Sequence, residues 1–266
     1  MKIVLVQFAP LRDNRAASRR RVASLMAEAR GDWFVLPEMA LSGFSMNLEA
    51  TSWSDEDFAF FSALAEGKRA YVTVGGVREG RNCAFTFDRR GELISTYEKR
   101  HLFSISGEDE SYAAGLGVEG FEVEEERGQG GVASLGVGPA ICYDLRFPYH
   151  FWKQAPAAGI YFVIAAWPSS RREHWRTLLA ARAIENQAFV VGVNRTKDPS
   201  PEGAAGGAGE SLAAETEYSG DSLLLDPRGR ILLDCGEAEG AFAAEIDPAE
   251  VDAWRERFGA MADRLE

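Results

Sequence analysis

Segments with the alternation of β-strands and segments with the periodicity of α-helices follow one another along the whole chain, and this order constrains the fold most. It is typical of an α/β protein with one large sheet or two stacked sheets. Periodicity alone equally allows a doubly wound parallel sheet. The expected strands are Lys2–Ala9, Asp32–Pro37, Ala70–Val77, Asn82–Phe87, Glu92–Glu98, Glu119–Glu125, Gly131–Ile141, Ile160–Ala166, Ala188–Arg195, Asp221–Asp226, Arg230–Asp234 and Ala241–Ile246. The expected helices are Asp13–Arg30, Asp55–Lys68, Phe147–Ala158, Arg171–Gln187 and Pro248–Phe258.

No segment of the chain has the composition of a linker between domains. A stretch rich in Gly, Ala and Pro, residues 198–214, is expected to be a mobile surface loop. Expected strands follow this stretch as well as precede it, so it is a loop within one domain and not a linker between two. Residues 1–266 are therefore expected to form a single domain.

Composition argues against several classes of protein. The 266 residues carry a net charge of −12, and an acidic chain with a pI of about 4.9 repels the phosphates of nucleic acid. No window of about 18 residues is continuously apolar, so no membrane-spanning helix is expected. Residues 1–7 suit a first strand, because no signal-peptide cleavage pattern follows them. We expect a cytoplasmic protein that binds neither nucleic acid nor membranes.

The cysteines and histidines are few. The chain has three cysteines, Cys83, Cys142 and Cys235. An odd number of widely spaced cysteines disfavours a disulfide framework or a structural zinc site. The three histidines lack metal-binding spacing. Cys83 and Cys235 lie in strand-like runs and are expected in the core. We expect no metal and no organic cofactor.

Cys142 is the first candidate for a catalytic side chain. It follows the apolar segment Gly131–Ile141 and precedes a polar segment that is expected to open a helix. Backbone N–H groups at such a turn lower the pKa of a thiol and can hold an oxyanion. The alternative is a buried structural cysteine, the commoner role of a free cysteine.

Two charged residues also follow strand segments. Glu38 comes directly after Asp32–Pro37, at the carboxyl end of a strand, where open α/β sheets place their sites. A desolvated carboxylate there suits a general base. Lys99 follows Glu92–Glu98 and is able to stabilise a developing negative charge. Taken alone, each is better explained as a solvated surface charge.

Together, the three residues occur in motifs that resemble those of the nitrilase superfamily, whose members carry a Glu–Lys–Cys triad in this chain order. Glu38 lies in LPEMALSGF, Lys99 in YEKRHLF and Cys142 in GPAICYDLRFP. The resemblance covers nearly the whole chain, including WRTLLAARAIENQAFVVGVNR and YSGDSLLLDPRGRIL. The flanking residues are most similar to the omega-amidase (2-oxoglutaramate amidase) group.

The resemblance implies an architecture and an assembly. Nitrilase-like chains form a four-layer α-β-β-α sandwich and dimerise through the helical layer near the cysteine, so we expect a homodimer. Members use a second glutamate after the lysine motif. Spacing to Tyr112 and Gly115 places it at Glu108, with the adjacent Asp109 and Glu110 as alternatives.

The resemblance also implies a mechanism that needs no cofactor. Cys142 attacks an amide carbon while Glu38 takes its proton. Lys99 and the Tyr143 backbone N–H stabilise the oxyanion, and Glu108 positions the amide or the lysine. Ammonia leaves, and water hydrolyses the thioester. The expected substrate is a small molecule, the ω-amide of a dicarboxylic acid such as 2-oxoglutaramate.

The far carboxylate of such a substrate needs a basic partner. Arg171 and Arg172 are the expected partners, and Arg146 and Arg195 are competing candidates. Relatives often carry Asn where this chain has Ala166, which puts in doubt a polar substrate contact there. The residues expected to line an apolar wall, each of which is also explained as plain core, are Phe44, Met46, Tyr143 and Trp167.

Other functions remain open at this point. Within the superfamily, the chain could act as an N-carbamoyl amino acid hydrolase or an aliphatic amidase, and nitrile hydrolysis is less favoured by the flanking residues. A catalytically silent binding protein on the same fold is a different class, against which the intact Glu38, Lys99 and Cys142 count. A papain-like hydrolase needs a suitably placed His and Asn pair, which the chain lacks.

Overall fold

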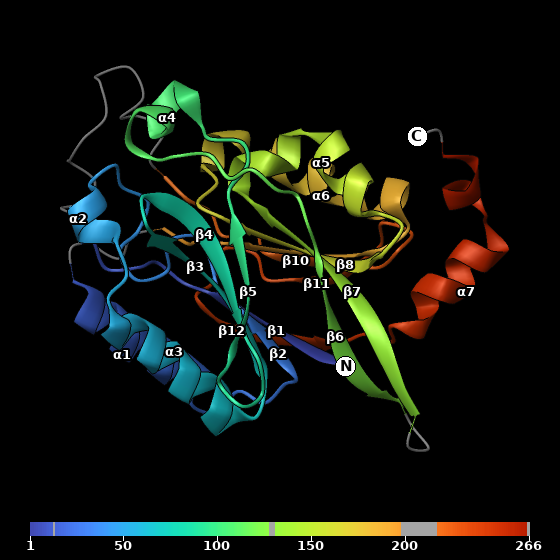
Figure 1. Cartoon of the computed structure of the whole chain (residues 1–266), viewed down its shortest axis with the longest axis horizontal. Coiled ribbons are helices and arrows are strands. Elements are labelled where there is room, and N and C mark those ends of the chain that lie inside the picture. Colours follow the sequence, from blue (N-terminus) through green and yellow to red (C-terminus); the bar gives the residue numbers. More distant parts are fainter. Residues whose placement is uncertain (13, 128–130, 198–216, 265–266) are drawn as a thin grey trace.

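The computed structural model describes residues 1–12, 14–127, 131–197 and 217–264 and contains two six-stranded sheets (Figure 1). The first sheet has the order β12-β1-β2-β3-β4-β5, with bounds Gly240–Glu245, Lys2–Gln7, Trp33–Val35, Tyr71–Arg78, Arg81–Phe87 and Leu93–Glu98. The second has the order β11-β10-β9-β8-β7-β6, with bounds Ile231–Asp234, Leu223–Leu225, Phe189–Asn194, Ala158–Ala165, Gly131–Ile141 and Phe121–Arg127. The α-helices are α1 (Arg15–Met26), α2 (Leu48–Thr51), α3 (Asp55–Lys68), α4 (Glu108–Ser111), α5 (Pro148–Gln154), α6 (Arg172–Asn186) and α7 (Ala249–Arg257).

The sheets pack face to face, and helices cover their outer faces. In β1, Ile3 and Leu5 belong to the apolar core between the sheets. The alternating Val4 and Val6 belong to the core beneath α1 and α3. A third core, which includes Leu179, lies between the second sheet and helices α5 and α6. The expected four-layer α-β-β-α sandwich is confirmed, and a single doubly wound sheet is excluded.

Parallel pairing places three chain turns at one end of the sandwich. Strands β1, β2 and β3 are parallel, as are β7, β8 and β9. Two antiparallel pairings link β3, β4 and β5, so β5 ends at the same edge as β3. Glu38 follows β2, Lys99 follows β5 and Cys142 follows β7. The topology therefore brings three distant sequence segments toward one site.

Most expected elements occur with small shifts at their ends, and the larger differences concern helices. The expected helix Phe147–Ala158 ends at Gln154, and α2 was not expected. The expected helix Asp13–Arg30 ends early, because Lys68 on α3 donates to the carbonyls of Met26 and Ala27 and completes the end of α1. The expected loop Lys99–Gly117 contains α4 and a 3-10 turn, both too short to show a period.

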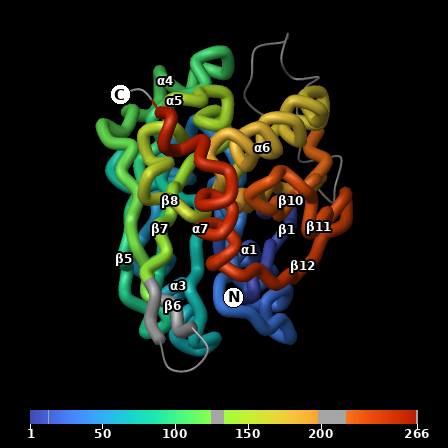
Figure 2. The backbone as a smooth tube through the Cα atoms, turned by 90° about the vertical axis from the view of Figure 1, so that its right-hand side faces the viewer, coloured from blue at the N-terminus to red at the C-terminus, as the bar shows by residue number. Residues whose placement is uncertain are grey.

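The helix α7 runs across the ends of neighbouring elements (Figure 2). Arg255 on α7 donates to the backbone carbonyls of Ala155, Ala158 and Asn186, which ties α7 to α5, β8 and α6. Within the described ranges, no helix is both long and apolar enough to cross a membrane. The glycine-rich segment 198–214 lies outside the described residues.

Candidate active site

A buried ion cluster lies where the strand ends meet. Lys99 Nζ donates to Glu38 Oε1 at 2.9 Å and to Glu108 Oε1 and Oε2 at 3.0 and 2.8 Å. All three side chains are at most 1% exposed. On α4, Glu108 is buried, whereas Asp109 and Glu110 are exposed. The structure therefore brings Glu38, Lys99 and Glu108 together and leaves the two neighbouring carboxylates outside.

Neutral donors complete the cluster. Glu38 Oε2 accepts from the Ala166 N–H at 2.8 Å, and Glu108 Oε2 accepts from the Phe103 N–H at 2.7 Å. Asn82 Nδ2 donates to Glu38 Oε1 at 2.7 Å and to Glu108 Oε1 at 2.9 Å. Asn82 was not predicted, since its only signal is a polar residue at the start of an apolar strand. All four carboxylate oxygens are hydrogen-bonded, so both glutamates have fixed orientations.

Lys99 remains a cation in this environment. Burial opposes the charge, but the carboxylates of Glu108 and Glu38 outweigh burial and raise the pKa of Lys99 well above its usual value. The cluster therefore places a permanent positive charge beside Cys142.

Cys142 directly follows β7 and begins a 3-10 helix, Cys142–Arg146. Its φ of +46° lies in the left-handed region, which is strained for a residue with a side chain. The Asp144 carboxylate accepts from the Ile141 N–H at 2.9 Å and so holds the turn closed. Tyr143, whose backbone N–H is the expected oxyanion donor, is the next residue in this turn and is half-buried.

The expected lowering of the thiol pKa by this turn is wrong. Burial and the charge of Glu38 raise the pKa of the Cys142 thiol well above its usual value. The opposing effects of Lys99 and the Ala166 N–H are smaller. No α-helix begins at the cysteine to lower the pKa, because α5 starts only at Pro148. The thiol is therefore neutral near neutral pH and needs a base.

Asp144 also ties the segment after β5 to the cysteine turn. Its carboxylate accepts from Tyr97 Oη at 2.8 Å, from the His101 N–H at 2.9 Å and from His101 Nδ1 at 2.7 Å. His101, Asp144 and His150 are the one group of possible metal ligands among the described residues, with atoms within 4.8 Å. His150 Nε2 donates to the Pro139 carbonyl at 3.0 Å. These hydrogen bonds explain why the three side chains lie together. The spacing of the residues in the sequence did not reveal this group.

Only some of the residues expected to form an apolar wall of the substrate site lie near the buried ion cluster. The Phe44 ring centroid lies 5.6 Å from Lys99 Nζ. Met46 is half-buried and packs against a small core with Phe44. Trp167 is 3% exposed, and its Nε1 donates to the Arg171 carbonyl at 2.8 Å. Phe44 thus lies beside the ion cluster, whereas Trp167 belongs mainly to the core.

Arg172 and Arg195 both interact closely with other residues of the chain. Arg172 forms ion pairs with Asp221 at 2.6 Å and Glu237 at 2.9 Å, so its charge is already compensated. This weakens the expectation that Arg172 binds a substrate carboxylate. Arg195 is 2% exposed, and its Cζ lies 4.2 Å from the ring centroid of Tyr218.

Arg146 lies near the cysteine and near Arg171. Their Cζ atoms stack on the rings of Trp167 at 4.8 Å and Phe103 at 5.4 Å. Burial and the charge of Arg171 lower the pKa of Arg146, while interaction with Cys142 opposes this shift. Two neighbouring guanidinium groups on aromatic rings form a local basic region on an acidic protein.

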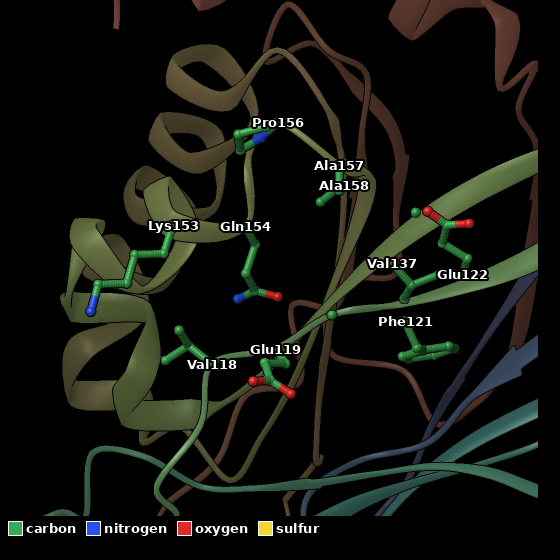
Figure 3. Close-up of a pocket in the computed structure, with 12 residues that line it drawn as sticks. Val118, Glu119, Phe121, Glu122, Val137, Lys153, Gln154, Pro156, Ala157 and Ala158 are labelled. Carbon is green, nitrogen blue, oxygen red and sulfur yellow. The ribbon is translucent and has the colours of Figure 1, made fainter. Parts of the chain in front are cut away.

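A hollow of about 340 Å³ lies away from this cluster, between α5 and the strands β6 and β7 (Figure 3). Its polar lining residues are Glu119, Glu122, Lys153 and Gln154. Its lining contains no cysteine, serine, threonine or histidine, and none of the predicted site residues lines it. The candidate catalytic residues therefore lie at the strand ends and not in this hollow.

Comparison with known proteins identifies the family. The model of the carbon-nitrogen hydrolase family matches residues 5–256. The chain is 34% identical to a 2-oxoglutaramate amidase of Bacillus subtilis over 241 residues, which cover 87% of this chain and 84% of that protein. It is 35% identical to an omega-amidase of Yersinia enterocolitica over 241 residues, with the same shares of 87% and 84%. The chain belongs to the carbon-nitrogen hydrolase family.

A solved structure agrees with this assignment. A protein of the carbon-nitrogen hydrolase superfamily from Xanthomonas campestris is 30% identical and matches with a TM-score of 0.83 over 100% of this chain and 97% of that one. That structure carries an arsenic adduct in its active site. The family predicted from the motifs and the nitrilase-type sandwich are both confirmed.

Proposed function

We propose that this hydrolase cleaves the ω-amide of a small dicarboxylic acid, such as 2-oxoglutaramate, to the carboxylic acid and ammonia. The observation that carries the proposal is the buried Glu38–Lys99–Glu108 cluster beside Cys142. The similarity to proteins named 2-oxoglutaramate amidase and omega-amidase supports this substrate class.

The first half of the reaction forms a thioester. Cys142 Sγ attacks the amide carbon, its proton passes to Glu38, and the carbonyl electron pair moves onto oxygen. Because the pKa of the thiol is raised, proton transfer accompanies the attack. Lys99 and the Tyr143 N–H stabilise the oxyanion, and losing one such donor raises a barrier by about 3–4 kcal/mol.

The second half of the reaction releases both products. The oxyanion reforms the carbonyl, the C–N bond breaks, and Glu38 gives its proton to the nitrogen, which leaves as ammonia. Water then attacks the thioester carbon while Glu38 takes a proton from the water. The C–S bond breaks, the acid leaves, and the proton held by Glu38 restores the Cys142 thiol.

Arg146 and Arg171 are the proposed partners of the remote substrate carboxylate. Their proximity concentrates positive charge near Cys142, and a bound carboxylate relieves the repulsion between them. Arg146 stacks on Trp167 and contacts His174, and no carboxylate of the described residues pairs with it. Arg172 is less suited, because its ion pairs compete with a ligand.

A substrate panel scored by ammonia release tests the proposal. It contains ω-amides, N-carbamoyl amino acids, aliphatic amides and nitriles, with Cys142→Ala as the blank. We expect the highest kcat/KM for an ω-amide with a free carboxylate and a large loss when that carboxylate is esterified. A higher kcat/KM for an N-carbamoyl compound or a simple aliphatic amide would contradict the proposed substrate.

We also propose that the enzyme is a cytoplasmic homodimer. Helices α5 and α6, which lie beside the cysteine turn, expose Tyr149 at 51% and Ile184 at 56%, and these apolar surfaces suit an interface between copies. The free thiols of Cys83, Cys142 and Cys235 suit a reducing compartment.

A further inference from the structure

Asn82 contacts all three residues of the ion cluster, through the carboxylates of two and the backbone of the third. Its Nδ2 donates to Glu38 Oε1 at 2.7 Å and to Glu108 Oε1 at 2.9 Å. Its backbone carbonyl accepts from the Lys99 N–H at 2.8 Å. Asn82 is fully buried in β4. One residue of a sheet strand therefore sets the spacing of two carboxylates and the backbone position of the lysine between them.

The charges around Asn82 determine the orientation of its amide. Both N–H bonds of Nδ2 point to carboxylates, so the reversed orientation would place Oδ1 against two anionic oxygens. In the observed orientation, Oδ1 accepts no hydrogen bond from any described residue. A buried acceptor without a donor costs free energy. The two hydrogen bonds that Nδ2 donates therefore explain why an amide side chain occupies this position.

The same contacts distinguish the two oxygens of Glu38. Oε1 is occupied by Lys99 Nζ and Asn82 Nδ2. Oε2 accepts from the Ala166 N–H at 2.8 Å, and that N–H also acts on the Cys142 thiol. Oε2 is thus the oxygen on the side of the sulfur.

We propose that Asn82 is a positioning residue, an inference that rests on the proposed function. It binds Glu38 Oε1 and Glu108 Oε1 to one amide, so that Glu38 presents Oε2 to the proton of Cys142. It also separates two like charges at a fixed distance. Without this amide, the two carboxylates repel each other directly and the Glu38 side chain is able to rotate.

The titratable groups that face Glu38 are Lys99, Glu108, Cys142, Tyr112 and Tyr218. Burial raises the pKa of both tyrosines, so they stay neutral. Lys99 stays charged, because its pKa is raised. Neither the lysine nor the two tyrosines therefore produces an acid limb in the activity of this site.

Two pH profiles test the proposal: kcat/KM for ammonia release, and the rate of Cys142 alkylation by iodoacetamide followed by peptide mass. Burial raises the pKa of Cys83 and Cys235 to about 12, and peptide mass separates any labelling of these two thiols from that of Cys142. For Asn82→Ala we expect a loss of about 10–100-fold in kcat/KM and a shift of both acid limbs upward by about one pH unit. Asn82→Asp keeps the side-chain shape but adds a third negative charge, so we expect a larger loss.

The matched control is Thr86→Ala, which removes a buried hydroxyl from the same strand. Thr86 Oγ1 lies 2.9 Å from Thr73 Oγ1 and contacts no group of the ion cluster. We expect this variant to lower Tm and to leave both acid limbs unchanged. Each variant is measured only where its circular dichroism matches that of the wild type, and Asn82→Asp replaces Asn82→Ala if the latter does not fold.

Unchanged acid limbs in a folded Asn82 variant would overturn the positioning role. A loss of activity that Thr86→Ala reproduces without any change in pH dependence would also overturn it. Alkylation needs no substrate, so the two proposals fail separately. A wild type that releases no ammonia, together with a shifted alkylation limb in Asn82→Ala, would refute the amidase function and support the role of Asn82.

Discussion

At the residue scale, Lys99 sets the charge state of the site. Its ammonium lies between two buried carboxylates, which hold its pKa well above the usual 10.5 despite burial. A raised pKa means that the charged form persists to higher pH than in a free lysine. The site therefore keeps a positive charge well above neutral pH, as the proposed stabilisation of an oxyanion requires.

This predicts the alkaline side of the pH profile. We expect kcat/KM to show no descending limb due to Lys99 below about pH 10, since the lysine loses its proton only above its ordinary pKa. The measurement is kcat/KM from about pH 6 to pH 10, with circular dichroism at each pH to verify folding. A descending limb centred below about pH 9 in folded enzyme would contradict the assignment.

A second prediction concerns the neighbouring carboxylates of α4. Glu108→Gln removes the anion beside Lys99 and should lower kcat/KM by about 10²–10³-fold, since both the lysine and Asn82 lose a partner. Glu110→Gln makes the same substitution at an exposed glutamate two residues further along α4. It should leave kcat/KM within about twofold of the wild-type value. Equal effects of the two substitutions would show that Glu108 is not the second carboxylate of the site.

The sequence predicts the residues that directly follow strands and misses those whose role depends on distant partners. Glu38, Lys99 and Cys142 stand at strand ends, where sites of α/β proteins lie. Asn82 and Asp144 act through contacts with segments far along the chain, so no local pattern marks them. The raised pKa of Cys142 depends on burial, which the local sequence did not reveal.

At the element scale, the turn after β7 is shaped by Asp144 more than by helix propensity. Its carboxylate joins the Ile141 N–H, Tyr97 and His101, so the cysteine turn and the segment after Lys99 move as one unit. Burial opposes the ionised form of Asp144, but the His101 bond and the other bonds outweigh burial and lower its pKa. Its stabilisation is therefore present above the ordinary pKa of aspartate and is lost as pH falls through the lowered value.

Asp144→Asn tests this coupling. We expect the free energy of unfolding to fall by about 2–4 kcal/mol, because an amide cannot accept all of these bonds. We also expect kcat/KM to fall, since the cysteine turn loses its anchor. Urea unfolding measured beside kcat/KM provides the check. Asp88→Asn, which alters the β4–β5 turn away from the site, should cost stability without lowering kcat/KM.

Element boundaries were predictable where strong local signals exist. The helix Asp55–Lys68 begins as expected because Ser54 and Asp57 form a capping box, and it ends where Arg69 adopts a left-handed conformation. The apolar run 160–166 matches β8, whose residues are all buried. Helix α4 was missed, because four residues show no period.

At the scale of the whole molecule, periodicity could not choose between one doubly wound sheet and two stacked sheets. Both arrangements bury strands on both faces, and both place helices outside. Only the resemblance of the three motifs to a known family selected the sandwich. The residues of β1 show the two stacked sheets. Ile3 lies in the core between the sheets, and Val4 lies in the core beneath α1 and α3.

The proposed assembly makes a prediction at this scale. We expect light scattering after gel filtration to give about twice the chain mass of 29.1 kDa at micromolar concentration. Placing charges on the exposed apolar residues of α5 and α6 with Tyr149→Glu and Ile184→Glu should shift the mass toward one chain. A wild type that elutes with the mass of a single chain would contradict the dimer.

Intact-mass spectrometry of enzyme quenched during turnover detects the proposed thioester itself. With 2-oxoglutaramate, we expect a covalent acyl adduct that peptide mapping places on Cys142. We also expect Cys142→Ala to keep the wild-type circular dichroism, to form no adduct and to release no ammonia. Ammonia release by Cys142→Ala at the wild-type rate, or an adduct on Cys83 or Cys235 alone, would refute the thioester mechanism.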